Sequence, residues 1–336
     1  MATARQIAAL LSSLNQGDEE QCFAIALQVA ASEAKRGRKA VADELRVLVE
    51  QGRSKGWRER TRPSDAVIPI TKPRGELQNL LTSSYPQTKL TDLILKAKTV
   101  DNLSDMIEQQ RKREALRHHG LVPISTLLLV GPSGSGKTLT ASAIAGELHL
   151  PLYGVRFDSV ITRYMGETAS KLRLIFDQIG ATRGVYLFDE FDAIGGKRTA
   201  DNDIGEMRRV LNSFLQFLEE PRNTDSIVLC ATNHAELLDR ALFRRFDEVL
   251  EYELPDHGLA KELLRSRLAA FGFDETWWPT ICQDTEGLSH AELVAAAEDV
   301  MKYVILAGKL RADAQLLQDK LQKKRTTRDV LDHLEK

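Results

Sequence analysis

The period of the apolar positions changes along the chain, and these changes divide it into regions. Residues 1–52 place apolar side chains three and four positions apart, which predicts a small N-terminal helical domain. Residues 53–90 lack a sustained period and begin with a basic stretch broken by prolines, which indicates a linker. Helical periodicity returns in residues 256–310 and in the charged, amphipathic segment 311–336.

Residues 91–255 alternate short apolar runs with helical patterns. The runs are "STLLLVG", "LYGVRF", "GVYLFDE", "SIVLCAT" and "DEVLEYEL". Alternation of this kind is typical of parallel strands joined by right-handed helical crossovers, with helices on both faces of the sheet. We therefore predict an α/β fold with a five-stranded parallel sheet sandwiched by helices.

The composition narrows the class of protein. The chain has 336 residues, with 46 Lys and Arg against 48 Asp and Glu and a formal charge of −2. This balance argues against a protein that coats nucleic acid through general positive charge. No apolar run in the sequence approaches the roughly 18 residues of a membrane span, and the N-terminus is too short and too polar for a signal peptide. The three cysteines lie far apart without a CxxC pair, which fits a reducing compartment. A cytoplasmic, bacterial protein is predicted.

A glycine-rich motif follows the first apolar run. The stretch "GPSGSGKT", residues 131–138, matches G-x-x-x-x-G-K-[ST] between a predicted strand and a predicted helix, as the motif requires. Its backbone N–H groups and the helix N-terminus suit phosphate oxygens. Lys137 is expected to reach the β- and γ-phosphates of ATP, and Thr138 is expected to bind Mg²⁺. The predicted nucleotide-binding residues are Gly131, Pro132, Ser133, Gly134, Ser135, Gly136, Lys137, Thr138, Leu139 and Asp189.

Two adjacent carboxylates end the third apolar run, "VYLFDE". Asp189 is expected to complete the Mg²⁺ site beside the phosphate loop. Glu190 is expected to act as the base for an attacking water, or to orient it. Because neither acid is replaced by an amide, the sequence predicts an ATPase that converts ATP and water to ADP and phosphate.

Three longer motifs accompany the phosphate loop. They are "FDEFDAIGGKR", "ATNHAELLDRALFRRFDEVLEYELPD" and "TEGLSHAELVAAAEDV". With them the chain resembles the AAA+ ATPases, and within these the protein-remodeling branch of membrane-linked proteases and microtubule-severing and ESCRT-disassembling ATPases. The resemblance implies a large α/β ATPase subdomain over residues 91–255, a helical lid over 256–310 and a C-terminal charged helix over 311–336.

The resemblance also implies roles for three residues near the end of the large subdomain. Asn233 would help orient the water near the γ-phosphate. Arg244 and Arg245 match the region of the arginine that acts on a neighbouring subunit's site, which implies a ring and, in this family, a hexamer. The chain departs from the family here, because the segment is two residues shorter and the arginines are adjacent. Arg245 aligns better than Arg244 with the arginine that acts on the neighbouring subunit. Arg244 is either a second such arginine or an ion-pair partner at the subunit interface.

The same resemblance assigns Arg163, Tyr164, Met165 and Gly166 to the loop that faces the central pore. An aromatic ring at this position would grip an extended polypeptide of any sequence. The implied function is that of an ATP-driven remodeler, or unfoldase, that threads a polypeptide substrate through the pore of a hexamer. The sequence contains no recognisable peptidase motif, so proteolysis would need a separate peptidase partner.

Two other functions stay open at this point. An ATP-dependent assembly switch would use ATP to assemble and hydrolysis to disassemble, and it would tolerate loss of the Tyr164 side chain. A nucleic-acid-linked ATPase, such as a loader or regulator, is suggested by the basic residues between 35 and 62. The near-neutral total charge and the lone aromatic residue of that stretch, Trp57, argue against it, so nucleic acid is not expected as a partner.

Overall fold

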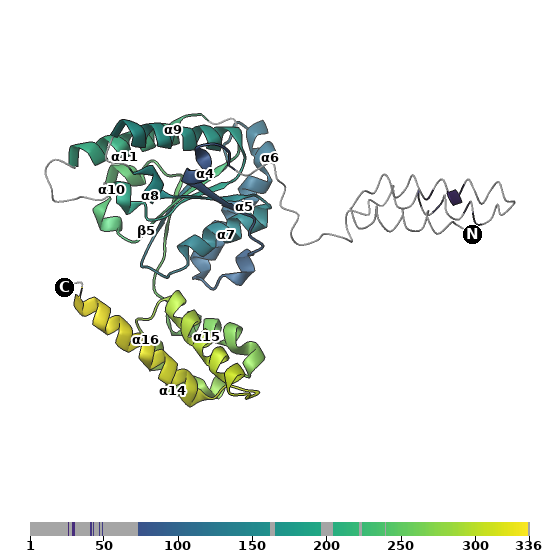
Figure 1. Cartoon of the computed structure of the whole chain (residues 1–336), viewed down its shortest axis with the longest axis vertical. Helices are drawn as coiled ribbons and strands as arrows, with labels where there is room; N and C mark the ends of the chain where they lie inside the picture. The colour runs from purple at the N-terminus through teal and green to yellow at the C-terminus, as the bar shows by residue number, and fades with distance from the viewer. Residues whose placement is uncertain are drawn as a thin grey trace. The chain divides into compact units, whose positions relative to one another are not determined.

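A computed structural model describes residues 73–161, 165–195, 204–221, 224–238 and 240–334, together with a few isolated residues nearer the N-terminus. The chain divides into two compact units, Met1–Ile68 and Pro69–Lys336 (Figure 1). The predicted N-terminal helical domain lies almost entirely outside the described residues.

The elements of the α/β part of the second unit alternate along the chain. In order they are α4 (Leu77–Leu80), β1 (Leu81–Ser84), η3 (Leu90–Asp92), α5 (Ala97–Arg111), α6 (Arg113–His118), β2 (Thr126–Val130), α7 (Lys137–Leu148), β3 (Leu152–Val155), α8 (Phe157–Val160), α9 (Met165–Ala181), β4 (Val185–Phe188), α10 (Asp192–Gly195), α11 (Ile204–Glu219), β5 (Ile227–Thr232), η4 (Ala235–Leu237), α12 (Arg240–Phe243) and β6 (Glu248–Glu251).

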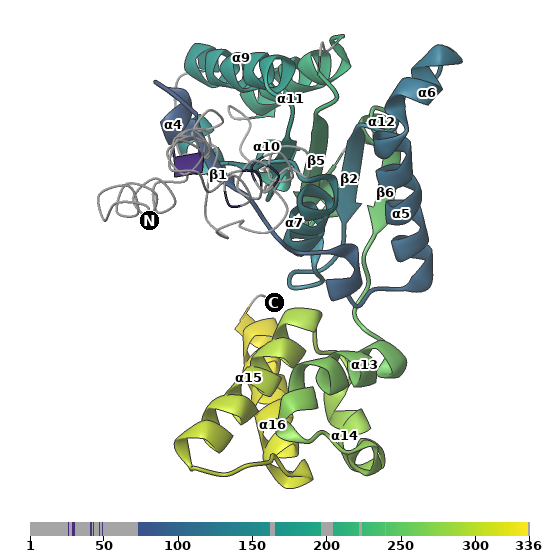
Figure 2. The same cartoon turned by 90° about the vertical axis from the view of Figure 1, so that its right-hand side faces the viewer.

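The sheet has the strand order β1-β3-β4-β5-β2-β6. The five predicted strands, β2 to β6, pair in parallel and confirm the predicted parallel sheet (Figure 2). A sixth strand, β1, pairs antiparallel with β3 at the edge of the sheet, with Leu81 opposite Val155. Together with α4 and η3, this strand corrects the predicted linker, because residues 77–92 form part of the second unit.

Strands β2, β3, β4 and β5 are buried along most or all of their length, which explains their continuous apolar runs, whereas only Leu250 is buried in β6. Neighbouring residues of β2 point to opposite sides of the sheet, as alternation in a strand requires. Leu128 packs in a core with residues of α9 and α11, whereas Leu127 and Leu129 pack in a second core with residues of α5 and α7. Figure 1 shows the two helix pairs on opposite sides of the sheet. This is the predicted sandwich of helices.

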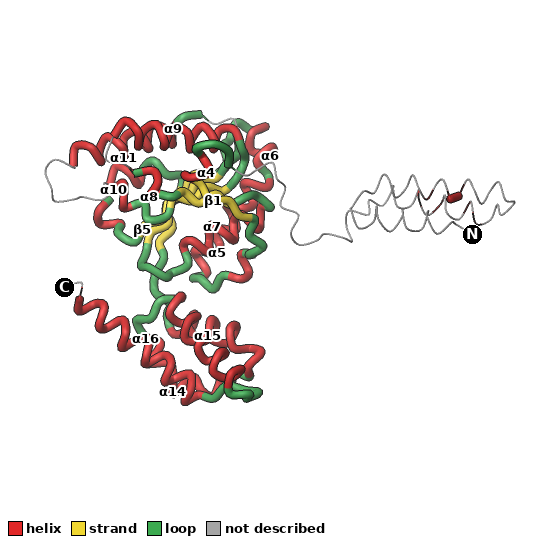
Figure 3. Tube along the Cα trace, in the orientation of Figure 1, coloured by secondary structure: helices red, strands yellow, loops and turns green. Residues whose placement is uncertain are grey.

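The C-terminal part of the second unit is helical in its described residues (Figure 3). We call residues 257–334 the lid. A single apolar core joins residues of α13, α15 and α16, so the predicted separate C-terminal helix is part of the lid. None of the helices in the described parts of the chain combines the length and the apolar character that a membrane crossing requires. The lid elements are α13 (His257–Leu268), η5 (Ala269–Phe271), η6 (Glu275–Trp277), α14 (Trp278–Ile281), η7 (Cys282–Thr285), α15 (His290–Leu306) and α16 (Ala314–Leu334).

Candidate functional site

The glycine-rich loop connects the buried strand β2 to the N-terminus of α7. Two of its glycines are required by close packing. A Cβ atom on Gly131 would lie 2.2 Å from the backbone oxygen of Tyr252. Gly134 has a φ of +74°, and a Cβ atom there would lie 2.8 Å from the Oγ of Ser289 in the lid. Side chains at these positions would therefore displace the loop from β6 and from the lid.

Lys137, the first residue of α7, is buried with its ammonium group inside the loop. Its Nζ donates to the carbonyl oxygens of Gly131 at 2.7 Å and Pro132 at 2.8 Å, and to the Oδ1 of Asn233 at 2.8 Å. Burial lowers the pKa of Lys137, while the carboxylates of Asp189 and Asp192 oppose this shift. A buried cation held by oxygen atoms at a helix N-terminus is well placed to bind an anion.

Thr138 and Asp189 lie beside the lysine and contact each other. The Thr138 hydroxyl donates to the Oδ2 of Asp189 at 2.6 Å. Asp189 follows the last residue of β4, a strand that is buried along its whole length. A hydroxyl and a carboxylate are the oxygen ligands with which proteins hold Mg²⁺ next to substrate phosphates. The pair therefore fits the predicted ion.

Glu190 adopts a backbone conformation that is rare for its residue type. Its φ is +54°, in the left-handed region, and its backbone N–H donates to the Oδ1 of Asp189 at 3.0 Å. A non-glycine residue in this region costs about 1–2 kcal/mol. Such strain is commonly found at functional sites. The Glu190 side chain is exposed at the cavity described next.

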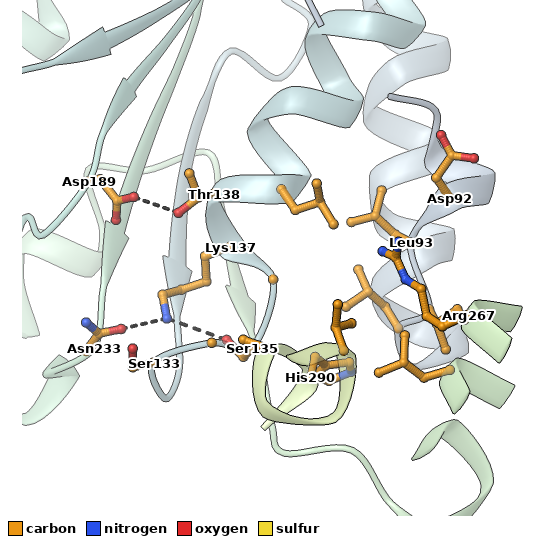
Figure 4. A pocket seen from close by; sticks show the side chains of 18 of the residues that line it. Asp92, Leu93, Ser133, Ser135, Lys137, Thr138, Asp189, Asn233, Arg267 and His290 are labelled. Atoms are coloured by element: carbon orange, nitrogen blue, oxygen red, sulfur yellow. Dashed lines mark hydrogen bonds between the residues drawn. The ribbon is translucent and has the colours of Figure 1, made fainter. Parts of the chain in front are cut away.

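The predicted residues meet because β4, β5 and β2 are neighbours in the sheet and end at the same edge. Lys137, Thr138, Asp189, Glu190 and Asn233 line one cavity of about 430 Å³ (Figure 4). Ser133, Gly134, Ser135, Gly136 and Leu139 line it as well. Three sequence segments that were assigned to phosphate, metal and water thus form a single site.

The opposite wall of this cavity is formed by residues that sequence reasoning missed. They are the apolar side chains of Leu93, Ile94, Leu95, Leu263 and Val294, and the polar side chains of Arg267 and His290. Among the described residues, neither ring nitrogen of His290 has a hydrogen-bond partner, although both nitrogens are buried. Burial lowers the pKa of His290. Nothing in the spacing of the histidines indicates this position.

Arg244 and Arg245 do not line the cavity. Both arginines precede β6, which runs parallel to β2. They therefore lie where these strands begin, whereas the phosphate loop lies where β2 ends. Arg245 forms an ion pair with Glu219 at the end of α11, and both side chains are about half exposed. Arg244 is exposed. Within one chain, then, these arginines and the nucleotide-loop residues lie apart.

The predicted pore loop is only partly described. Arg163 and Tyr164 lie outside the described residues. Met165 and Gly166 form the first positions of α9, where the carbonyl oxygen of Gly166 accepts a hydrogen bond from the Ser170 hydroxyl at 2.7 Å.

Comparison with known proteins gives consistent results. The family model described as "ATPase family associated with various cellular activities (AAA)" matches residues 127–254. The chain is 32% identical over 308 residues to the uncharacterized AAA family ATPase y4kL of Sinorhizobium fredii, a match that covers 91% of this chain and 90% of that protein.

Two further relatives have names that state an activity. The chain is 33% identical to the proteasome-activating nucleotidase of Methanoregula boonei, over 66% of this chain and 52% of that protein. It is 30% identical to the ATP-dependent zinc metalloprotease FtsH of Helicobacter pylori, over 70% of this chain and 38% of that protein. The chain thus corresponds to about half of the first protein and to a smaller share of the second.

Proposed function

This chain belongs to the AAA family of ATPases, and from this premise we propose that it is an ATP-driven protein remodeler that threads a polypeptide through the pore of a hexamer. The observation that supports the ATP-driven part is the meeting of Lys137, Thr138, Asp189, Glu190 and Asn233 around one cavity.

The phosphates of ATP would lie against the backbone of residues 131–136 and the N-terminus of α7. The Lys137 ammonium would donate to the β- and γ-phosphates from the position in which it now contacts Asn233. Thr138 and Asp189 would hold a Mg²⁺ ion, which when bound neutralises charge on the phosphate oxygens. The apolar wall that includes Ile94 and Leu95 would cover the base.

Hydrolysis would use the two polar side chains at the end of β4 and β5. Glu190 would accept a proton from the attacking water or orient it, and the strained backbone holds its side chain at the cavity. Asn233 would help to orient the same water through its amide. Its oxygen already accepts from Lys137, which leaves the amide N–H₂ group available as a donor.

The remaining transition-state charge would be neutralised by a neighbouring subunit. Arg244 and Arg245 lie away from the nucleotide residues of their own chain, as an arginine that acts in trans requires. The Arg245–Glu219 pair is half exposed, and exposed pairs contribute only about 0.2–1 kcal/mol, so Arg245 can leave Glu219 at little cost. Head-to-tail subunits that share active sites form either a closed ring or a spiral, and both arrangements are compatible with the proposed hexamer.

Polypeptide is the proposed substrate, and a separate peptidase is the proposed partner. The sequence position of Tyr164 supports the first proposal. The similarity to two relatives that are named as a proteasome-activating nucleotidase and an ATP-dependent zinc metalloprotease supports the second proposal. Residues 1–52 would recruit substrate or partner, since they precede the ATPase part and fall in a separate compact unit.

The experiment that tests threading compares Tyr164→Ala and Tyr164→Phe with the wild type. We expect both variants to assemble with ATP, as measured by light scattering after gel filtration, and to keep basal hydrolysis. Tyr164→Ala should lose casein-stimulated hydrolysis, whereas Tyr164→Phe should retain it because the ring is preserved. Full stimulation in Tyr164→Ala would contradict threading and favour the assembly switch. DNA-stimulated hydrolysis with steep salt dependence would favour the nucleic-acid-linked alternative.

A further inference from the structure

The last helix of the lid, α16, is bonded to the first turn of α15. The Nη1 of Arg328 lies 3.1 Å from the Oε2 of Glu292 and also donates to the carbonyl oxygen of Gly287. Both charged side chains are only 29% exposed. Solvent therefore screens this pair less than a surface pair.

The carboxylate that Arg328 contacts also caps α15. The Oε2 of Glu292 accepts from the backbone N–H of Ser289 at 2.6 Å and from the Ser289 hydroxyl at 2.7 Å. In return the Ser289 Oγ accepts from the Glu292 N–H at 3.3 Å, which completes a capping box. Arg328 thus restrains the oxygen atom on which the start of α15 depends.

This turn is also the place where the lid meets the phosphate loop. The backbone N–H of Ala291 donates to the carbonyl oxygen of Gly134 at 3.0 Å. The tight approach of Ser289 to Gly134 leaves no room for a Cβ atom there. His290, between these two lid residues, lines the cavity. A displacement of the turn would therefore move both the loop contact and one wall of the site.

We propose that Arg328 is a positioning residue for the nucleotide site: through Glu292 it holds the 287–292 turn of the lid against the phosphate loop. This inference rests on the proposed function, since it requires the cavity to bind an adenine nucleotide. Arg328 does not line the cavity, and neither does Glu292. Loss of the pair should weaken nucleotide binding without changing the groups that act in hydrolysis.

The chain supplies a matched control in Lys324, one turn earlier on α16. Its Nζ lies 3.0 Å from the Oδ2 of Asp299, and the two side chains are 28% and 35% exposed. This pair joins the same two helices with similar burial, but it lies away from the turn that contacts Gly134. Lys324→Gln therefore reports the general effect of removing an ion pair between α15 and α16.

The experiment measures Kd for a fluorescent ADP analogue, KM and kcat for ATP, and thermal stability in the full-length protein. We expect Arg328→Gln to raise Kd and KM at least about threefold, with kcat within about twofold of the wild type. Lys324→Gln should lower the melting temperature by about as much as Arg328→Gln does, but it should leave Kd unchanged. Arg328→Lys, which keeps the charge but loses the planar fork, should fall between the wild type and Arg328→Gln.

Glu292→Gln tests the same contact from its other residue, and it can be measured even if Arg328→Gln fails to fold. If the two residues act through one contact, the double variant should bind ADP no more weakly than the weaker single variant. An unchanged Kd in both single variants, or equal effects of Arg328→Gln and Lys324→Gln, would overturn the positioning role alone. A wild-type protein that fails to bind the ADP analogue would overturn the proposed function and the inference with it.

Discussion

The side-chain ammonium of Lys137 lies 2.8 Å from the amide oxygen of Asn233, a residue 96 positions further along the chain. This contact joins the first residue of α7 to the end of β5. The same ammonium contacts the carbonyl oxygens of Gly131 and Pro132. One buried cation thus connects the phosphate loop with the residue assigned to the water.

Lys137→Met should weaken ATP binding about 10- to 100-fold, because charge-assisted hydrogen bonds contribute roughly 1.5–3 kcal/mol. Titration with a fluorescent ATP analogue measures this effect. Lys89→Met is the control, because Lys89 also donates to a backbone carbonyl, that of Gly146 at 2.9 Å, but does not line the cavity. Equal losses in the two variants would show that lysine removal acts through the fold.

Glu190→Gln should separate binding from hydrolysis. The amide cannot accept the proton of water, so kcat should fall about 10²- to 10⁴-fold, the range for loss of a general base. Affinity for ATP should stay within about twofold, because the carboxylate is not among the groups assigned to the phosphates. Single-turnover hydrolysis and equilibrium binding measure the two effects. Hydrolysis at the wild-type rate would remove Glu190 from the mechanism.

Strands β2, β3, β4 and β5 were recognisable because both faces of the sheet are covered over most of their length. Leu127, Leu128 and Leu129 are all fully buried, and continuous apolar runs are the direct result. The edge strand β1 has the sequence LTSS, in which only Leu81 is buried. β1 pairs with β3 along one side only, and its residues after Leu81 are not buried. Its sequence therefore has no apolar period, and the strand is not recognisable from sequence.

The part of the site that a local motif encodes, the phosphate loop, was predictable from sequence. The second wall of the cavity was not predictable, because His290, Arg267 and Ile94 come from three distant segments and acquire a shared role only in the folded chain. The ion pair between Arg245 and Glu219 was also not predictable, because it too joins residues that are distant in the sequence. Contacts between distant segments have no signature in the spacing of a single sequence.

If Arg244 and Arg245 act in trans, defects in two different subunits should complement each other. Arg245→Ala alone should lower kcat about 10³-fold or more. Mixing Arg245→Ala with Glu190→Gln should restore part of the activity, because an intact Glu190 site then meets an intact arginine from its neighbour. ATPase assays across mixing ratios measure this, and Arg244→Ala is tested in the same way. No recovery, together with normal assembly, would contradict a shared site.

The pH dependence of stability provides a test of the buried ring nitrogens of His290. The ordinary pKa is 6.5, and burial lowers the folded-state pKa below it. Between these two values the unfolded chain binds more protons than the folded chain, so stability should fall as the pH drops below about 6.5. Above that pH the group is neutral in both states and contributes no pH dependence.

His290→Phe removes this titration while it keeps a planar ring against the apolar wall of the cavity. The loss in free energy of unfolding between pH 7.5 and pH 5.5 should therefore be smaller in His290→Phe than in the wild type. Urea denaturation of the nucleotide-free protein at both pH values measures the difference. His257→Gln is the matched control, because His257 is also the first residue of its helix, α13, but is exposed. Acid sensitivity unchanged in His290→Phe, or reduced equally in His257→Gln, would show that His290 is not held neutral in the folded protein.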